Sequence, residues 1–403
     1  MTDLSVSLIV IPLLAVLAPV LAAALGSVVK IPVVVFEIVL GILIGPSLLD
    51  WVNPTEFIDT LANLGLAMLF FMAGNEINFA AIKGRPLKRA SLGWLISLGA
   101  GVVVGILFAP TPTAGVFIGV ALCSTALGTI LPMLRDAQEL ETPFGRAVTA
   151  IGAAGEFGPL IAISLFLSGR NPGPSTLVLI LFAVITAAAI WLASRGSHQG
   201  LHRLVAATLH TTGQFAVRFV ILIMALLAAL SIALGLDMLL GAFAAGVLWR
   251  VLVATAEPRA REVIEMKLDA VAFGFLVPVF FINTGIAFNL TALISNPATL
   301  ALVPLFLVLF LVIRGLPGLL ASPPGATKAD KRAIVLFSAT GLPIIVAVTQ
   351  IGVDHGQLDT SIAAALVGAG MLSVLLFPLI ALGHRKRSSE ILSRPTHGPS
   401  SGR

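Results

Sequence analysis

The chain has 403 residues, of which 58% are hydrophobic and only 11% are charged, and its mean hydropathy is +1.06. Soluble domains carry roughly 25% charged residues, so a chain this apolar cannot cover itself with a polar surface and must have lipid as its solvent. The net charge of +5 does not indicate nucleic acid, because the basic residues fall in short loops between apolar runs. The single cysteine, Cys123, lies in an apolar run, which excludes a disulfide framework or a cysteine-based metal site.

The apolar runs predict thirteen membrane-spanning helices, since a hydrocarbon core about 30 Å thick needs about 20 residues per helix. The first run is predicted to be a spanning helix rather than a signal peptide, because the acidic Asp3 precedes it where a signal peptide has basic residues. The predicted spans are residues 4–25, 31–51, 58–79, 91–109, 113–134, 144–168, 174–194, 212–235, 237–254, 268–292, 297–321, 331–353 and 358–383. The polar residues 384–403 are expected to form a disordered tail.

The basic residues predict the orientation. Thirteen spans place the two termini on opposite sides of the membrane, and basic residues concentrate in cytoplasmic loops. With the N-terminus outside, the cytoplasmic loops and tail hold 21 of the 24 basic residues. Arg170 remains outside, and Arg218 and Arg314 lie in apolar runs. We therefore expect an outside N-terminus and a cytoplasmic C-terminus.

Small, hydroxyl and helix-breaking residues interrupt two of the predicted spans. They are Ser124, Thr125, Gly128 and Pro132 in the fifth span and Thr340, Gly341 and Pro343 in the twelfth. Paired interruptions in two halves of a membrane protein indicate a transport site at the midplane. Because seven spans separate them, the two interrupted helices run in opposite directions, which predicts inverted six-helix repeats (residues 1–168 and 212–383) joined by a linker helix at 174–194. The alternative is that Gly and Pro are simply common in membrane helices.

Glu156 is the main candidate for ion binding. It lies about twelve residues into the span that starts near Phe144, roughly 18 Å along the helix at 1.5 Å per residue. A charge at this depth costs on the order of 3 kcal/mol, so it needs a reason to be there. A carboxylate binds either a proton or a small cation, but not both, and Glu156 is therefore predicted to bind the transported monovalent cation and protons in turn. The alternative is a helix-packing acid that is paired permanently with a base.

Four further ionisable or amide side chains are candidates. Arg314 stays protonated, so it is predicted to be a fixed charge partner of Glu156 or Glu76 rather than a proton carrier. It is expected to act either as a purely structural clamp or by tuning the site. Glu76 and Glu37, near the cytoplasmic face, and Asn283, in the middle of a span, are candidates for lining an inner vestibule. The alternative for the acids is simple solvation or pairing, and for Asn283 it is helix packing.

Oxygen atoms at the interruptions are candidate ligands for a hard alkali cation, which prefers oxygen donors. They are the hydroxyls of Ser124, Thr125 and Thr340 together with the backbone carbonyls freed there. The sequence has no G-x-x-x-x-G-K-[ST] motif and no histidine pair with metal-binding spacing, so no nucleotide and no cofactor is expected.

Four stretches, taken in order, resemble the monovalent cation:proton antiporters, in the branch that contains the glutathione-gated potassium efflux systems and bacterial sodium/proton exchangers. They are residues 37–47 (EIVLGILIGPS), 64–76 (ending in FFMAGNE), 124–126 (STA) and 278–282 (PVFFI) followed by Gly285. The resemblance implies a homodimer in the bacterial inner membrane, with the fifth and twelfth helices crossing in a mobile core. It also implies that Arg314 matches the basic residue of the eleventh helix, and it leads us to expect no nucleotide-binding regulatory domain.

The resemblance also places the ion-binding acid of the family in the sixth helix. There the family usually has an Asp preceded by Asp, Asn or Gln, whereas this chain has Gly155 and Glu156. The leading hypothesis is secondary antiport of sodium or potassium against protons at Glu156. A carrier of organic anions or bile-acid-like solutes with the same architecture is the alternative, because half-helix N-termini suit an anion. A sensor or scaffold that moves nothing is a third hypothesis.

Overall fold

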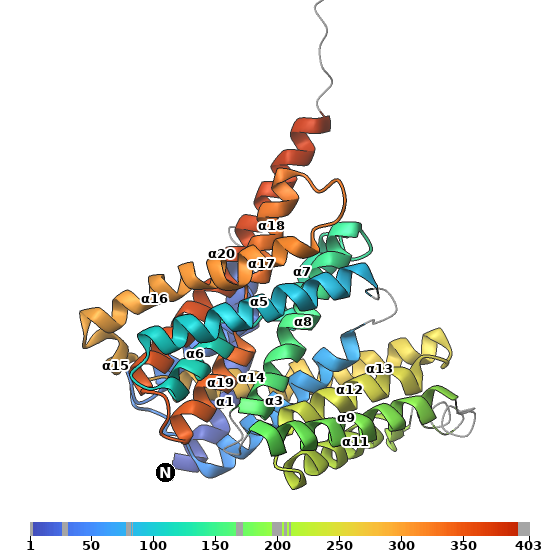
Figure 1. Cartoon of the computed structure of the whole chain (residues 1–403). Coiled ribbons are helices and arrows are strands. Elements are labelled where there is room, and N and C mark those ends of the chain that lie inside the picture. Colours follow the sequence, from blue (N-terminus) through green and yellow to red (C-terminus); the bar gives the residue numbers. More distant parts are fainter. Residues whose placement is uncertain are drawn as a thin grey trace, which may run out of the picture.

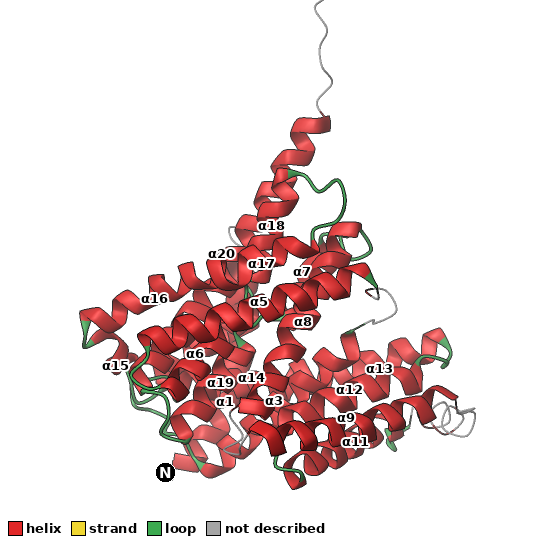
Figure 2. Cartoon of the chain, in the orientation of Figure 1, coloured by secondary structure: helices red, strands yellow, loops and turns green. Residues whose placement is uncertain are grey.

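The computed structural model describes residues 3–25, 31–77, 84–166, 172–195 and 211–393 and the single positions 82, 204 and 208. Every regular element within these ranges is a helix (Figure 2). Arg170, the basic residue predicted to lie outside, and the tail from residue 394 fall outside the described residues.

The helices run in chain order through the membrane domain (Figure 1). They are α1 (Asp3–Leu25), α2 (Val33–Ile44), α3 (Glu56–Glu76), α5 (Arg85–Phe108), α6 (Pro112–Leu122), α7 (Leu127–Asp136), α8 (Pro143–Phe166), α9 (Pro172–Arg195), α11 (Phe215–Ala233), α12 (Met238–Val253), α13 (Pro258–Val271), η1 (Ala272–Leu276), α14 (Val277–Ile286), α15 (Leu290–Ile294), α16 (Pro297–Leu309), η2 (Phe310–Gly315), α17 (Leu316–Gly318), η3 (Leu319–Ala321), α18 (Lys328–Ser338), α19 (Pro343–Asp354) and α20 (Thr360–Ser393).

The all-helical membrane fold predicted from the sequence is confirmed. Eleven spans in the described residues are long and apolar enough to cross a membrane, and α2 and α12 are shorter apolar helices. Two predicted boundaries were wrong. The span predicted at 31–51 is helical only to Ile44, because Gly45 and Pro46 stop the helix and the chain turns there. The span predicted at 268–292 begins earlier, at Pro258, and passes through the π-helical turn η1 before it ends at Ile286.

The C-terminal segment also differs from its prediction. Residues 384–393, expected to be disordered, continue helix α20 as far as Ser393. The physical reason is an anchor on this part of the helix, since Arg385 forms ion pairs with Glu139 and Asp330. These contacts stabilise the helical end of α20, although its polar sequence has little apolar surface to bury by itself.

The helices form two groups (Figure 1). In the first group α12 packs on α3 and α11, and α14 packs on α2 and α3. In the second group α5 packs on α6 and α8, while α16, α18 and α19 pack on α20. Helix α8 contacts members of both groups, with α5 on one side and α9 and α12 on the other. The helix that carries Glu156 therefore lies at the boundary between the two groups.

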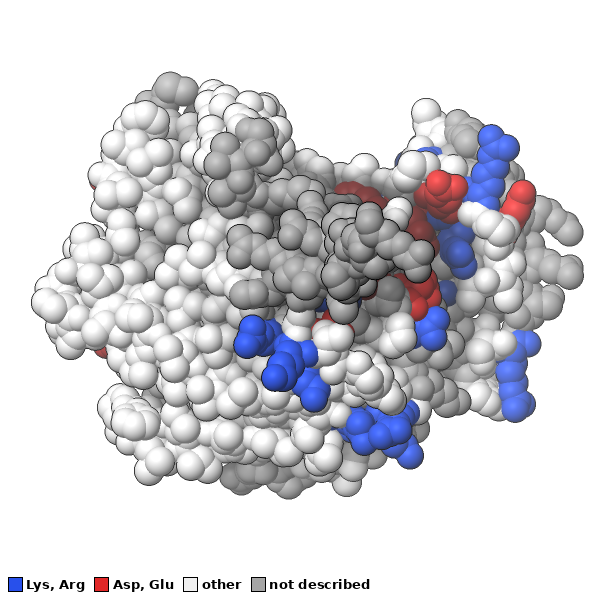
Figure 3. Space-filling model, turned by 90° about the horizontal axis from the view of Figure 1, so that it is seen from above, with Lys and Arg blue, Asp and Glu red and all other residues white. Residues whose placement is uncertain are grey.

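The start of α1 and the end of α20 lie at opposite ends of the molecule (Figure 1). Figure 3 views the molecule from the side towards which α20 projects, and charged side chains gather from the centre to the right of that face. A charged face opposite the N-terminus is the distribution that the basic loops predict. Its assignment to the cytoplasm remains a prediction.

Candidate ion-binding site

The two predicted helix interruptions lie against each other. Helix α6 ends at Leu122 and α7 begins at Leu127, while α18 ends at Ser338 and α19 begins at Pro343. The backbone N–H of Ala126 donates a hydrogen bond to the carbonyl oxygen of Thr340 over 2.8 Å. Backbone groups released by one interruption are thus satisfied by the other, as a site inside a membrane requires.

The first interruption covers only the first part of the predicted segment. Residues 123–126 are non-helical, whereas Gly128 and Pro132, predicted as helix breakers, lie inside α7. The hydroxyl of Ser124 donates to the carbonyl oxygen of Ala121 over 2.8 Å, a local bond that competes with the helical pattern. The hydroxyl residues rather than Gly and Pro therefore mark the break.

The second interruption matches the prediction more closely. Gly341 is non-helical, and Pro343 is the first residue of α19. A proline at this position loses nothing by lacking an N–H, because the first N–H groups of a helix have no partner within it. The hydroxyl of Ser373 on α20 hydrogen-bonds both the N–H and the carbonyl oxygen of Gly341, each over 3.1 Å.

Helix α8 is joined to the first interruption through its proline. Pro159 has no N–H, so the carbonyl oxygen of Gly155, four residues earlier, is left without its helical partner. The N–H of Thr125 donates to this oxygen over 2.9 Å. The proline thereby fixes the interruption beside the residue that precedes Glu156.

Glu156 is buried beside this junction, with 2% of its surface exposed. The backbone of Leu127, the first residue of α7, acts as a hydrogen-bond donor to its carboxylate. Within the described residues its Oε2 atom has no hydrogen-bond partner. The positive ends of the half-helix dipoles of α7 and α19 lie at the same cavity, which lowers the cost of a negative charge at this depth.

The cavity beside Glu156 has a volume of about 710 Å³. Residues from the starts of both half-helices line it, namely Gly128 and Thr129 of α7 and Pro343 of α19. Glu37 of α2 lines it as well. Such a cavity has room for a hydrated monovalent cation beside the free oxygen of Glu156.

Arg314 is not the charge partner that the sequence analysis predicted. It is 1% exposed and lies in the π-helical turn η2, but in the described chain it forms no ion pair with Glu156 or Glu76. Its Nε donates to the hydroxyl of Thr125 over 2.8 Å, and its Nη2 donates to the carbonyl oxygen of Ile151 over 2.7 Å. The positive charge therefore sits near the C-terminal ends of α6 and α18, whose dipoles are negative.

The three predicted hydroxyl ligands lie at the junction and are directed to backbone carbonyls. Thr125 donates to Ser338 over 2.6 Å, and Thr340 donates to Leu336 over 3.0 Å. Ser124 donates to Ala121 in the last turn of α6, as described above. Thr129, which the sequence analysis did not single out, is the hydroxyl that lines the cavity of Glu156.

The three candidates for the vestibule lie in different places. Glu76 lines a polar pocket of about 280 Å³ that also contains Arg135 and Arg250. Glu37 lines the cavity of Glu156 instead. Asn283 donates from Nδ2 to Oδ1 of Asp59 over 2.9 Å and so joins α14 to the first turn of α3, away from Glu76 at the other end of that helix.

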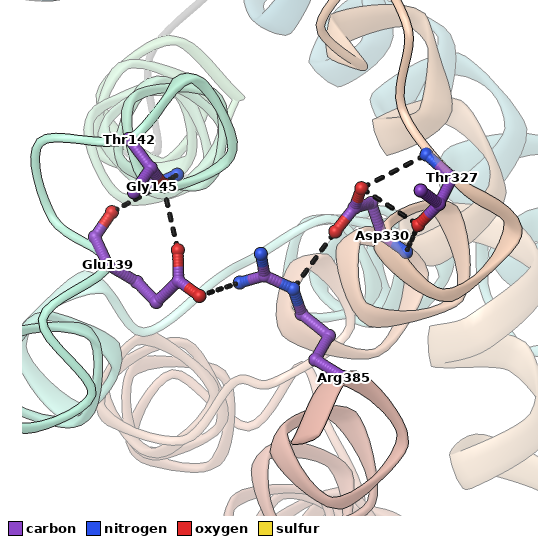
Figure 4. Close-up of polar contacts among 6 residues, drawn as sticks. All are labelled: Glu139, Thr142, Gly145, Thr327, Asp330 and Arg385. Atoms are coloured by element: carbon purple, nitrogen blue, oxygen red, sulfur yellow. Dashed lines mark hydrogen bonds and ion pairs between the residues drawn. The ribbon is translucent and has the colours of Figure 1, made fainter. Parts of the chain in front are cut away.

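Beyond the candidates, Arg385 links three segments of the second helix group (Figure 4). Its Nη1 lies 2.9 Å from Oε1 of Glu139, and its Nε donates to Oδ1 of Asp330 over 2.9 Å. Asp330 also completes a capping box with Thr327 at the start of α18. The guanidinium of Arg385 lies 3.6 Å from the centre of the Phe144 ring at the start of α8. Arg385 therefore connects the ends of the half-helices α7 and α18 to α20.

A buried acid beside two joined helix interruptions is the arrangement expected of secondary transporters. In the described part of the chain there is no group of three His, Cys, Asp or Glu side chains that could hold a metal ion.

The sequence comparisons identify the family. The family described as sodium/hydrogen exchanger, transmembrane, matches residues 13–382, and the chain belongs to this family. It is therefore a multi-pass protein of the cell membrane. The putative Na⁺/H⁺ antiporter YjbQ of Bacillus subtilis (strain 168) is 27% identical over 392 residues, which are 93% of this chain and 62% of that protein. The Na⁺/H⁺-K⁺ antiporter GerN of Bacillus cereus is 27% identical over 366 residues, covering 86% of this chain and 88% of GerN.

A solved structure has the same fold. The sodium proton antiporter MjNhaP1 from Methanocaldococcus jannaschii superimposes with a TM-score of 0.66 at 18% identity, over 97% of this chain and 99% of that one. The overall antiporter fold predicted from the sequence is therefore confirmed.

Proposed function

We propose that the chain exchanges a monovalent cation, sodium or potassium, for protons across the cell membrane. The observation that carries this is Glu156, which is buried beside the two interruptions, lines a cavity, and has one carboxylate oxygen without a hydrogen-bond partner in the described chain. One carboxylate cannot hold a proton and a cation together, so binding of either releases the other. Exchange follows when the site opens to the two sides of the membrane in turn.

The two helix groups support an alternating-access movement. Each group draws helices from both halves of the chain, as inverted repeats at residues 1–168 and 212–383 with a linker helix at 174–194 would produce. The proposal includes thirteen spans, counting the short α2 and α12, and a cytoplasmic C-terminus. It also includes the homodimer that the resemblance to the antiporter family implies.

Arg314 is part of the proposed machinery as a positioning residue. Its guanidinium binds Thr125 in the interruption and Ile151 one turn before Gly155, so it fixes α8 relative to α6. A fixed positive charge that does not pair with Glu156 leaves that carboxylate free for the cation. The relatives described above are named as cation:proton antiporters, and the organic-anion alternative gains no support from them.

The test is transport in proteoliposomes. With a sodium or potassium gradient imposed, the wild-type protein should move protons, as measured by a pH-sensitive dye inside the vesicles. Glu156→Gln should abolish this movement, because an amide can neither release a proton nor balance the charge of a cation. Glu56→Gln, which alters an exposed acid at the start of α3, is the control and should behave as wild type. Unimpaired exchange by Glu156→Gln would falsify the proposal.

A further inference from the structure

The cavity beside Glu156 contains a second buried acid. Glu37 is 6% exposed and lies one turn inside α2, and it lines the same cavity. Most of the remaining wall is apolar and comes from α1 (Val16 and Val20) and from the segment around η1 (Phe273). One continuous space therefore joins two carboxylates from different helices.

Helix packing does not account for this acid. Within the described residues Glu37 has no hydrogen-bond or ion-pair partner, although a buried charge without a partner is unfavourable. The neighbouring positions do pack closely. A Cβ atom on Gly41 would lie 2.2 Å from the carbonyl oxygen of Ile282, so α2 and α14 are in backbone contact there. Glu37 is thus held on a firmly packed helix while its carboxylate faces the cavity.

The surroundings of Glu37 differ from those of Glu76. The Glu76 carboxylate shares a polar pocket with Arg135 and Arg250, which compensate its charge. Glu37 faces an apolar wall, with no such cation among the described residues that line the cavity. Among the described residues that line the cavity none compensates an ionised Glu37, and a proton or a small cation that enters the cavity would do so.

We propose that Glu37 is a second binding site for the transported monovalent cation and for protons, placed in the cavity that leads to Glu156. The proposal rests on the exchange function proposed above and adds a stage to it. A cation entering the cavity is first held at Glu37 and then passes to the free oxygen of Glu156. Glu37 therefore sets the concentration at which the cavity fills, whereas Glu156 performs the exchange.

Transport kinetics in proteoliposomes test the proposal. We expect Glu37→Gln to raise the sodium concentration for half-maximal exchange about tenfold and to change the maximal rate less than about twofold, since it removes binding without removing the exchange step. Glu37→Asp should restore most of the affinity, and Glu56→Gln should match wild type. A wild-type half-maximal concentration in Glu37→Gln overturns the proposal. Exchange by Glu156→Gln would instead contradict the proposed function.

A labelling experiment gives an answer if Glu37→Gln folds poorly. Dicyclohexylcarbodiimide forms a stable N-acylurea with protonated carboxyl groups in apolar surroundings, and mass spectrometry of the peptide locates the adduct. In the full-length protein, sodium chloride should slow labelling of Glu37, whereas choline chloride at the same ionic strength should not. This protection should persist in Glu156→Gln if Glu37 is a site of its own. Labelling of Glu37 that sodium does not change overturns the proposal.

Discussion

The backbone N–H of Ala126 donates to the carbonyl oxygen of Thr340 over 2.8 Å, which joins the two interrupted helices through their main chains. The two residues are more than two hundred positions apart, one in each half of the chain. A hydrogen bond between main-chain atoms does not depend on which side chains the two residues carry. This bond therefore defines the junction. The side chains around it then decide how firmly α8 and η2 are attached.

Thr125→Val should destabilise the junction. The hydroxyl accepts a hydrogen bond from Nε of Arg314 and donates one to the carbonyl oxygen of Ser338. Valine has the same shape but leaves both groups buried without a partner, at a cost of about 1–3 kcal/mol each. We expect a lower unfolding temperature in detergent and slower exchange. The control is Thr349→Val, because the hydroxyl of Thr349 bonds only to carbonyls of its own helix. Equal unfolding temperatures for the two variants would contradict the prediction.

Gly155→Ala should disrupt the contact between α8 and Arg314. A Cβ atom at this position would lie 2.5 Å from Nη2 of Arg314 and 2.5 Å from Oγ1 of Thr125. Overpacking of this kind costs roughly 1–3 kcal/mol, more than the gain of about 1 kcal/mol that alanine brings to a helix. We expect reduced stability and strongly reduced exchange.

Gly99→Ala is the matched control, because nothing lies within 4 Å of a Cβ atom at that helical position. It should keep exchange at the wild-type level and leave the unfolding temperature unchanged or slightly raised. If Gly155→Ala behaves like Gly99→Ala, then the guanidinium is free to move, and the close packing of Arg314 is not needed for transport.

The sequence predicted the helices and the two interruptions, because these depend on local composition. Apolar runs of about 20 residues and clusters of hydroxyl residues can be recognised without knowing what lies next to them. Glu156 was recognised as a candidate on the same basis, as a charge inside an apolar run. The partners of Arg314 could not be predicted, because they depend on which helix faces η2.

Two local signals in the sequence indicate further contacts of the fold. Pro159 lies four residues after Gly155, which marks a free carbonyl oxygen in α8 and hence a contact there with an N–H donor from another segment. Asp330, three residues after Thr327, completes the pattern of a capping box at the start of α18. The ion pairs of Arg385 had no such signal, since its partners are distant in sequence and it lies in a stretch with the composition of a disordered tail.

Arg385→Gln should loosen the end of α20. The side chain of Arg385 is 19% exposed and bridges Glu139 and Asp330, so its loss leaves two half-buried carboxylates without the positive charge between them. We expect a loss of about 1–2 kcal/mol, smaller than for a fully buried pair because water screens these groups in part. Arg385→Lys should lose part of this stability, because an ammonium group on a flexible stem does not reproduce the two-sided geometry of a guanidinium.

Thermal unfolding in detergent at low and at high salt measures the effect. The control is Arg146→Gln, since Arg146 forms a 3.5 Å ion pair with Glu141 in which both side chains are largely exposed. That variant should change stability by no more than about 0.5 kcal/mol. The difference between Arg385→Gln and wild type should shrink at high salt, and a difference that is absent at low salt would rule out the bridge as a source of stability.

Glu76→Gln should weaken cation access without abolishing exchange. The Glu76 carboxylate offsets the charges of Arg135 and Arg250 in the polar pocket, and its field also acts on Glu156. Removing it leaves the pocket more positive, so a cation approaching from this side meets a less favourable potential. We expect the half-maximal sodium concentration to rise a few-fold at low ionic strength and the rise to diminish as added choline chloride screens the pocket.

Glu141→Gln is the control, because the carboxylate of Glu141 lines the same pocket but is 83% exposed and already screened by water. A rise that does not depend on ionic strength would mean that Glu76 binds the cation directly, as is proposed for Glu156, rather than acting through its field.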